Sequence, residues 1–80
     1  MSIFDVIRKA NAYVLATKGV QGEPDYVRLS RNLEKGRSWR LMYHYSLFYP
    51  EIAQEGGVVD GGEYIIDVDD NSGEISVFYP

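Results

Sequence analysis

The acidic segment near the C-terminus has the residue types of a calcium loop. Asp67, Asp69 and Asn71 place oxygen-bearing side chains at alternate positions, and calcium loops begin in this way because hard cations prefer oxygen ligands. The later positions of the calcium-loop pattern do not match. Ser72 stands where the sharp turn needs glycine, and Phe78 stands where a carboxylate must close the site. The segment therefore predicts the solvated tip of a hairpin, and we expect no metal site and no cofactor.

His44 is the only histidine and the first candidate for a general base. A general base needs a nucleophile or substrate within hydrogen-bond reach, and usually a partner that orients it. Ser46 and Asp67 could meet His44 in space, but their spacing does not specify a catalytic arrangement. No glycine-rich turn joins a strand to a helix, so a phosphate-binding loop has no candidate either. We therefore expect no catalytic residues and a protein that is not an enzyme.

Residues 62–80 predict one β-hairpin, because two apolar runs flank a polar turn. Two registers compete. If Asp70 pairs with Glu74, apolar and acidic side chains mix on both faces. If Asp69 pairs with Glu74, one face is wholly apolar, and Gly73 lies at the loop end that needs a left-handed residue. A one-residue slip would expose the apolar set, which favours the second register. Its apolar face pairs Val68 with Ile75, Ile66 with Val77 and Tyr64 with Tyr79, and its outward face carries Asp67, Ser76, Asp69 and Glu74.

The N-terminal residues predict an amphipathic helix. Ser2 followed by Asp5 is typical of a helix start, because the hydroxyl and the carboxylate satisfy early amide groups. Lys18 and Gly19 predict the end, since a cation suits the negative end of a helix and glycine supplies the stop. Between these signals, mostly apolar side chains recur at three- and four-residue steps and form one stripe. The stripe consists of Ile3, Val6, Ile7, Ala10, Tyr13, Val14 and Thr17.

Alternating patterns predict two further strands, over residues 26–33 and 39–45. Between the second strand and the hairpin, residues 49–56 have the form of a short helix, with proline in the first turn and glycine at the end. Residues 57–62 read as a loop. We therefore predict an α+β fold in which the N-terminal helix packs on a curved four-stranded antiparallel sheet, in the order α-β-β-(short helix or loop)-β-β.

Composition predicts a single small domain over residues 1–80. The chain has no cysteine, which excludes disulfides and thiolate metal sites and is compatible with a reducing compartment. Residues 3–7 are too short and too interrupted by charge to be a signal segment, and no stretch approaches the roughly 20 apolar residues that span a membrane. We expect a soluble, cytoplasmic protein.

The formal net charge is −4, from 8 lysines and arginines and 12 aspartates and glutamates. Nucleic-acid binding depends on basic side chains that neutralise phosphates, and this chain has no long basic run. We therefore expect neither nucleic acid nor membrane as a partner. An acidic surface favours a basic protein partner.

Aromatic residues make up 14% of the chain, and they suit both a small core and a contact surface. The side chains predicted for the core are Trp39, Leu41, Ile66, Val68, Ile75 and Val77. On the opposite face of the sheet we expect a mixed apolar and charged patch, which would suit the docking of another protein. The patch consists of Arg40, Met42, His44, Ile65 and Phe78.

Two short motifs resemble those of small bacterial cystatin-like domains. The first is Trp39-Arg-Leu-Met-Tyr43, and the second runs from Gly61-Gly62 through Asp67-Val-Asp69 to Gly73-Glu-Ile75. Similar patterns occur in immunity proteins with a fold like nuclear transport factor, which bind and neutralise a cognate toxin, and in PepSY-type domains. The resemblance covers about residues 3 to 79, although a full fold of that kind has more helices and a longer sheet. It implies a cystatin-like arrangement and no catalytic residues.

The leading hypothesis is a non-enzymatic bacterial protein-binding module, in its most specific form an immunity or inhibitor protein that occludes a toxin with the outer sheet face or its rim. The alternatives are a small ligand-binding or catalytic domain, with His44 and Asp67 lining a pocket, and a homodimeric structural subunit. The residues predicted to contact a partner are Tyr43, His44, Tyr45, Tyr49 and Phe78 as anchors, with Asp67, Asp69 and Glu74 attracting basic groups.

Overall fold

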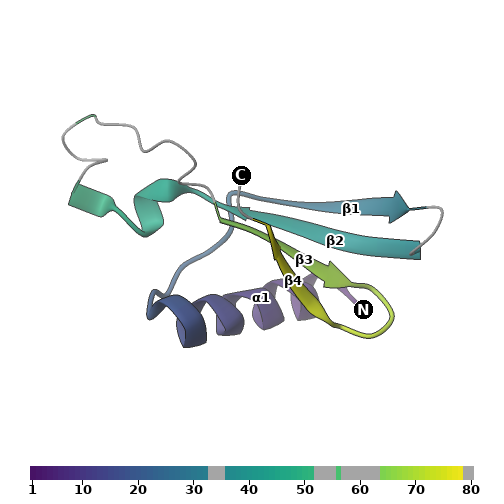
Figure 1. Ribbon diagram of the computed structural model, residues 1–80. Coiled ribbons are helices and arrows are strands. Elements are labelled where there is room, and N and C mark those ends of the chain that lie inside the picture. The colour runs from purple at the N-terminus through teal and green to yellow at the C-terminus, as the bar shows by residue number, and fades with distance from the viewer. Residues whose placement is uncertain (33–35, 52–55, 57–63, 79–80) are drawn as a thin grey trace.

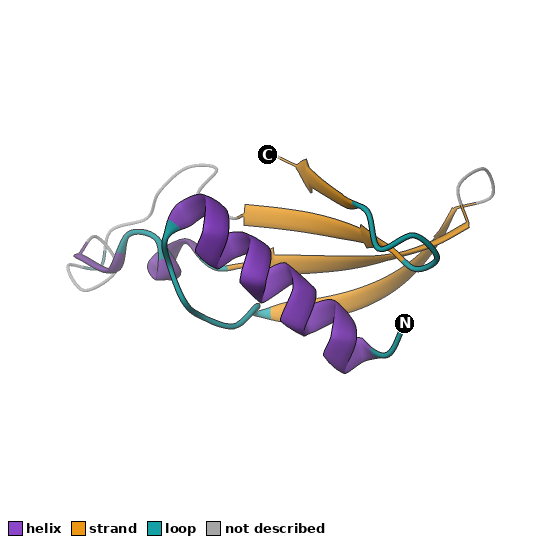
Figure 2. Ribbon diagram, turned by 90° about the horizontal axis from the view of Figure 1, so that it is seen from below, coloured by secondary structure: helices purple, strands orange, loops and turns teal. Residues whose placement is uncertain are grey.

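A computed structural model of the protein describes residues 1–32, 36–51, 56 and 64–78. Its elements are the helix α1 (Ile3–Lys18), the strands β1 (Tyr26–Asn32) and β2 (Gly36–Tyr43), the short 3-10 helix η1 (Tyr45–Leu47), and the strands β3 (Tyr64–Asp69) and β4 (Ile75–Phe78). The four strands form one antiparallel sheet in the order β1-β2-β3-β4 (Figure 1). Figure 2 shows α1 lying across one face of this sheet. The predicted α+β fold is confirmed.

The residues from which the ends of α1 were predicted cap the helix in the structure. Ser2 Oγ accepts a hydrogen bond from the Asp5 N–H at 3.1 Å, and the Asp5 carboxylate accepts one from the Ser2 N–H at 3.4 Å. These bonds satisfy first-turn amides, and hydrogen bonding with Ser2 lowers the pKa of Asp5. At the other end, Gly19 has a φ of 69° and donates its N–H to the Leu15 carbonyl at 3.0 Å. Glycine suits this left-handed position because it has no Cβ.

One apolar core lies between α1 and the sheet. Three buried residues of the helix stripe, spaced four apart, form the helix side of the core: Val6, Ala10 and Val14. Strands β2 and β3 form the other side with Leu41, Tyr43, Tyr64, Ile66 and Val68. Trp39, Ile75 and Val77 are partly buried and pack against this cluster. Each side chain that the sequence predicted for the core therefore lies in it or against it.

The β3–β4 hairpin has the register that the apolar pattern predicted. Val68 pairs with Ile75 and Ile66 pairs with Val77. The loop closes where expected, since the Asp69 N–H donates to the Glu74 carbonyl at 2.9 Å. Tyr79, the predicted partner of Tyr64, lies outside the described residues. In the loop, Asp69 Oδ1 accepts hydrogen bonds from the N–H groups of Asn71 and Ser72 at 2.9 and 2.8 Å, and these bonds lower the pKa of Asp69. The candidate calcium ligand Asp69 thus stabilises its own turn.

Replacing Gly73 with alanine is expected to destabilise the fold by about 1 to 2 kcal/mol, because Gly73 has a φ of +73° and a Cβ is unfavourable there. The new Cβ would also lie 2.6 Å from Lys9 Nζ, the flexible end of a side chain that can move away. Urea denaturation measures the change. Asn71→Ala, an exposed replacement in the same loop, is the control and should change the free energy of unfolding by less than about 0.5 kcal/mol. Equal effects of the two replacements would contradict this account.

The second strand differs from its prediction at both ends. β2 begins at Gly36, three residues before the predicted start at Trp39, and it ends at Tyr43 rather than Tyr45. The chain leaves the sheet there because η1 starts, with His44 as its N-terminal cap. Residue 33 of the first predicted strand lies outside the described residues. So do most of the predicted short helix over 49–56, of which only 49–51 and 56 are described, and the whole predicted loop at 57–62.

Candidate protein interface

The face of the sheet opposite α1 carries a partly exposed row of apolar side chains. Because side chains alternate along a strand, the registers place one residue from each strand side by side on this face. We call the row formed by Tyr26, Met42, Ile65 and Phe78 the apolar row, and the face that carries it the open face. The side chains of Tyr26 and Phe78 are 41% and 46% exposed. None of the described helices lies on this face (Figures 1 and 2).

The next row along the strands consists of Arg28, Arg40, Asp67 and Ser76, and it contains a bidentate ion pair. Arg40 Nε and Nη2 donate to the two carboxylate oxygens of Asp67 at 2.8 and 2.9 Å. The Arg40 guanidinium also lies 4.9 Å from the centre of the Phe78 ring. Hydrogen bonding to Asp67 raises the pKa of Arg40. These contacts hold Arg40, Asp67 and Phe78 in one arrangement, which lowers the entropy that a partner must remove on binding.

Arg28 is the uncompensated charge of this row. It lies directly opposite Arg40 on the neighbouring strand, and like charges in such a pair are unfavourable. The Arg28 side chain is exposed, and no carboxylate pairs with it in the described part of the chain. An acidic group from another molecule would therefore relieve the repulsion between the two arginines.

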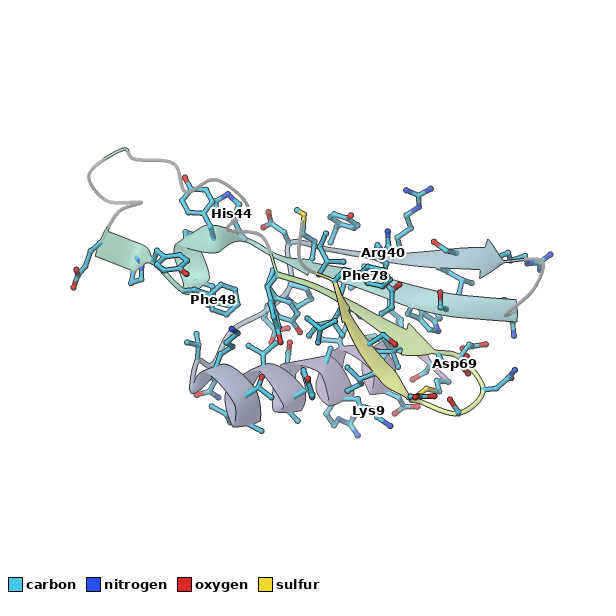
Figure 3. The ribbon with its side chains drawn as sticks, in the orientation of Figure 1. Lys9, Arg40, His44, Phe48, Asp69 and Phe78 are labelled. Atoms are coloured by element: carbon cyan, nitrogen blue, oxygen red, sulfur yellow. The ribbon has the colours of Figure 1, made fainter. Side chains whose placement is uncertain are left out.

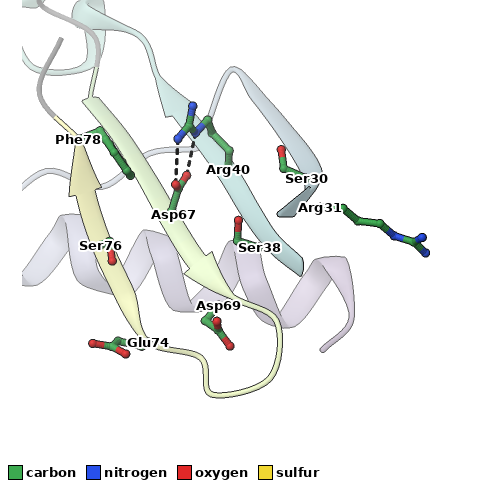
Figure 4. A pocket seen from close by; sticks show the side chains of 9 residues that line it. All are labelled: Ser30, Arg31, Ser38, Arg40, Asp67, Asp69, Glu74, Ser76 and Phe78. Carbon is green, nitrogen blue, oxygen red and sulfur yellow. Dashed lines mark hydrogen bonds and ion pairs between the residues drawn. The ribbon is translucent and has the colours of Figure 1, made fainter. Parts of the chain in front are cut away.

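A polar hollow of about 590 Å³ occupies the end of the open face near the β3–β4 turn. Its lining includes the hydroxyl groups of Ser30, Ser38 and Ser76, together with the Arg40–Asp67 pair (Figure 4). Two further carboxylates, those of Asp69 and Glu74, also line it, and Phe78 closes the end towards the apolar row. Strands β1 and β2 thus provide the arginines of the open face, and β3 and the turn that leads into β4 provide its carboxylates.

Four of the eight predicted contact residues lie together on the open face: Asp67, Asp69, Glu74 and Phe78. Tyr43 does not. Its side chain is fully buried in the core, where its hydroxyl donates to Asn11 Oδ1 at 2.6 Å and burial raises its pKa. This corrects the expectation that Tyr43 anchors a partner. Alternation along β2 places Tyr43 on the helix side, together with Leu41.

His44, Tyr45 and Tyr49 lie beyond the end of β2, in and around η1. His44 Nδ1 is 2.9 Å from Ser46 Oγ and accepts the Ser46 N–H at 3.2 Å, so the predicted neighbour is present but the contact caps η1. The His44 ring also packs on Tyr45, with ring centres 4.2 Å apart. Figure 3 shows His44 at one end of the molecule and Asp69 at the other. The predicted contact residues therefore form two separate groups.

Sequence reasoning missed Tyr26 and Arg28, although both belong to the open face. Their signal was the alternation within residues 26–33, which places them on one side of a strand. The alternation alone does not assign Tyr26 and Arg28 to a contact surface. The β1–β2 register does so, because it places Tyr26 beside Met42 and Arg28 beside Arg40.

Asp70 was also missed by the sequence analysis. It forms a hydrogen bond and two ion pairs at the end of the molecule next to the hollow. This carboxylate is 8% exposed and accepts a hydrogen bond from Trp39 Nε1 at 2.8 Å. Its other oxygen lies 3.0 Å from the Arg37 guanidinium, and the Met1 amino group lies 3.4 Å from Oδ1. The bond from Trp39, with the two cations, lowers the pKa of Asp70. Asp70 thus connects β2, the β3–β4 turn and Met1, which lies two residues before α1.

Within residues 1–32, 36–51, 56 and 64–78, no cluster of three or more histidine, cysteine or acidic side chains could hold a metal ion. In the same residues, no helix is both long enough and apolar enough to cross a membrane. The chain matches no protein-family model, no curated protein and no solved structure.

Proposed function

We propose that this chain is a non-enzymatic protein-binding module whose docking surface is the open face of the sheet. The observation that carries the proposal is the apolar row, in which Tyr26 and Phe78 are exposed, on a sheet whose other face packs against α1. Exposed apolar side chains bordered by charged ones are typical of protein interfaces. Tyr26 and Phe78 are the anchors, because aromatic side chains contribute most of the binding energy in such contacts.

The charges of the open face define the partner more closely than the net charge of −4 does. Carboxylates at Asp69 and Glu74 suit basic side chains, as a basic partner would supply. Arg28 suits an acidic one. A fitting partner therefore has an apolar strip and, along one side of it, an acidic group that meets β1 and basic groups that meet the β3–β4 hairpin.

An immunity or inhibitor protein is the specific form of this proposal. Such a protein acts by covering the working surface of its target, so it needs a rigid and complementary face and no reactive group. The bidentate Arg40–Asp67 pair and the antiparallel sheet beneath it supply that rigidity. The catalytic alternative receives less support, because Asp67 lines the hollow while His44 lies beyond the end of β2.

Replacing Phe78 with glutamate is expected to reduce retention of the partner at least about tenfold, since it removes an anchor and adds charge to the apolar row. The measurement compares proteins retained from a lysate of the source organism by immobilised wild type and variant. Phe4→Glu is the matched control, because Phe4 is 73% exposed on α1 and an acidic residue suits the first turn of a helix. Circular dichroism verifies that both variants fold.

The proposal requires a protein that wild type and Phe4→Glu retain and Phe78→Glu loses. If wild type, Phe4→Glu and Phe78→Glu retain the same proteins, the open face is not the docking surface. If wild type retains nothing above the background of the bare support, the module hypothesis fails.

A further inference from the structure

The open face has an ordered distribution of charge across the sheet. In the row that contains the ion pair, the residues from β1 across to β4 are, in order, Arg28, Arg40, Asp67 and Ser76. In the next row towards the β3–β4 turn, the order is Ser30, Ser38, Asp69 and Glu74. The β1–β2 half is therefore basic and the β3–β4 half is acidic. Such a face is electrostatically complementary to the same face of a second copy if the basic half of each copy lies over the acidic half of the other.

Two identical sheet faces can meet around a two-fold axis that lies between them, either perpendicular or parallel to the strands. With a perpendicular axis, each strand lies over its own copy, so the basic half of one sheet meets the basic half of the other and the acidic half meets the acidic half. Such like-charge contacts are unfavourable. With a parallel axis, β1 lies over β4 of the second copy and β2 lies over β3, while each row stays over the same row. Every arginine of one copy then lies over the acidic half of the other.

We propose that a second copy of this chain binds the open face, with the two sheets packed face to face around a two-fold axis parallel to the strands. The inference rests on the proposed function, because it names one partner for the same face. In this dimer Arg40 lies over Asp67 of the second copy, and Arg28 is within side-chain reach of Glu74 of the second copy. The second copy thus supplies the acidic group that Arg28 lacks among the described residues of its own chain.

The apolar row fits the same axis. Tyr26 lies over Phe78 of the second copy, and Met42 lies over Ile65 of the second copy. Packed sheets stand about 10 Å apart with strands inclined by about 30°, which leaves room for these side chains to interdigitate. Each aromatic anchor therefore meets an aromatic side chain, and both copies bury a row that is otherwise partly exposed to water. A different partner that uses this face must displace the second copy.

A charge exchange tests the arrangement. Sedimentation equilibrium of the full chain should show a dimer for wild type, and Arg28→Glu and Glu74→Arg should each raise its dissociation constant by about tenfold or more. The double variant R28E/E74R should restore dimerisation to near the wild-type level. Within one chain, residue 28 lies on β1 and residue 74 directly precedes β4, so they are about 14 Å or more apart across three strand spacings, and rescue must come from contact between copies.

Two control variants separate this geometry from general effects. Arg8→Glu reverses an exposed charge on α1 and should leave the dissociation constant unchanged, whereas Phe78→Glu should give a monomer and Phe4→Glu should not. Raising the salt concentration from about 50 to about 500 mM should weaken the wild-type dimer. Arg28→Glu removes the repulsion between Arg28 and Arg40, so unfolding is not expected to explain its effect.

A wild-type protein that remains monomeric up to about 1 mM would overturn the inference. So would a dimer that the single charge reversals do not weaken, or one that R28E/E74R does not restore. Any of these outcomes would exclude the dimer but not the proposed function, provided that Phe78→Glu still loses a partner that Phe4→Glu retains. If that comparison also shows no difference, the open face has no role in protein binding.

Discussion

Replacing Leu41 with alanine is expected to destabilise the protein by about 3 kcal/mol. Leu41 is fully buried at the centre of β2, between α1 and the sheet, and the shortened side chain loses its contacts and leaves a cavity. A domain of this size has a free energy of unfolding of only about 4 to 12 kcal/mol, so the variant loses a quarter or more of its stability. The midpoint of urea denaturation, followed by circular dichroism, measures the loss.

Leu15→Ala is the matched control for this experiment. It makes the same chemical change at a helix position that is 49% exposed, and alanine is at least as good a helix former as leucine. We expect a change within about 0.5 kcal/mol. Comparable losses at Leu41 and Leu15 would mean that the core does not lie where β2 meets α1.

Replacing Asp70 with asparagine is the second large expected effect. The buried carboxylate accepts a hydrogen bond from Trp39 and faces two cations, Arg37 and the Met1 amino group. A neutral side chain of the same shape leaves both cations without their counter-charge, which is costly next to a buried group. We expect a melting temperature lower by several degrees. Trp39 is the only tryptophan, so its fluorescence should also report that its hydrogen-bond acceptor has changed from a carboxylate to a neutral amide oxygen.

The same replacement should change how stability depends on pH. Asp70 has a lowered pKa in the folded protein, so near pH 3 to 4 the unfolded chain binds more protons than the folded one. The contribution of Asp70 is therefore complete above about pH 5, begins to decline near the ordinary aspartate pKa of about 3.9, and is lost as the pH falls through the folded value. Asp5 and Asp69 also have lowered pKa values and act in the same direction.

Urea midpoints between about pH 2.5 and pH 7 test this dependence. Asp70→Asn should flatten the decline at low pH relative to wild type and lower the midpoint at pH 7. Asp25→Asn, the same replacement at an exposed carboxylate before β1, should leave the midpoint at pH 7 nearly unchanged. An unaltered acid decline in Asp70→Asn would show that this carboxylate does not contribute to acid unfolding.

The amino-acid sequence determined the elements whose signals lie close together in the chain. Ser2, Asp5 and Gly19 define α1 because capping bonds join residues at most four apart. The β3–β4 register follows from nearby residues as well, since only the Asp69–Glu74 closure gives one wholly apolar face. The predicted core followed from the same alternation and lies where it was expected.

Much of the candidate interface depended on contacts between residues far apart in the chain, which only the tertiary structure decided. Tyr43 was predicted as an anchor because an exposed and a buried tyrosine look alike in sequence, and only packing against α1 assigns it to the core. The Arg40–Asp67 pair and the place of Arg28 required the registers of β1, β2 and β3. Alternation tells which side chains of one strand share a face. The position of that strand against its neighbours is set by the packing of the whole sheet, and with it the order of charges on the open face.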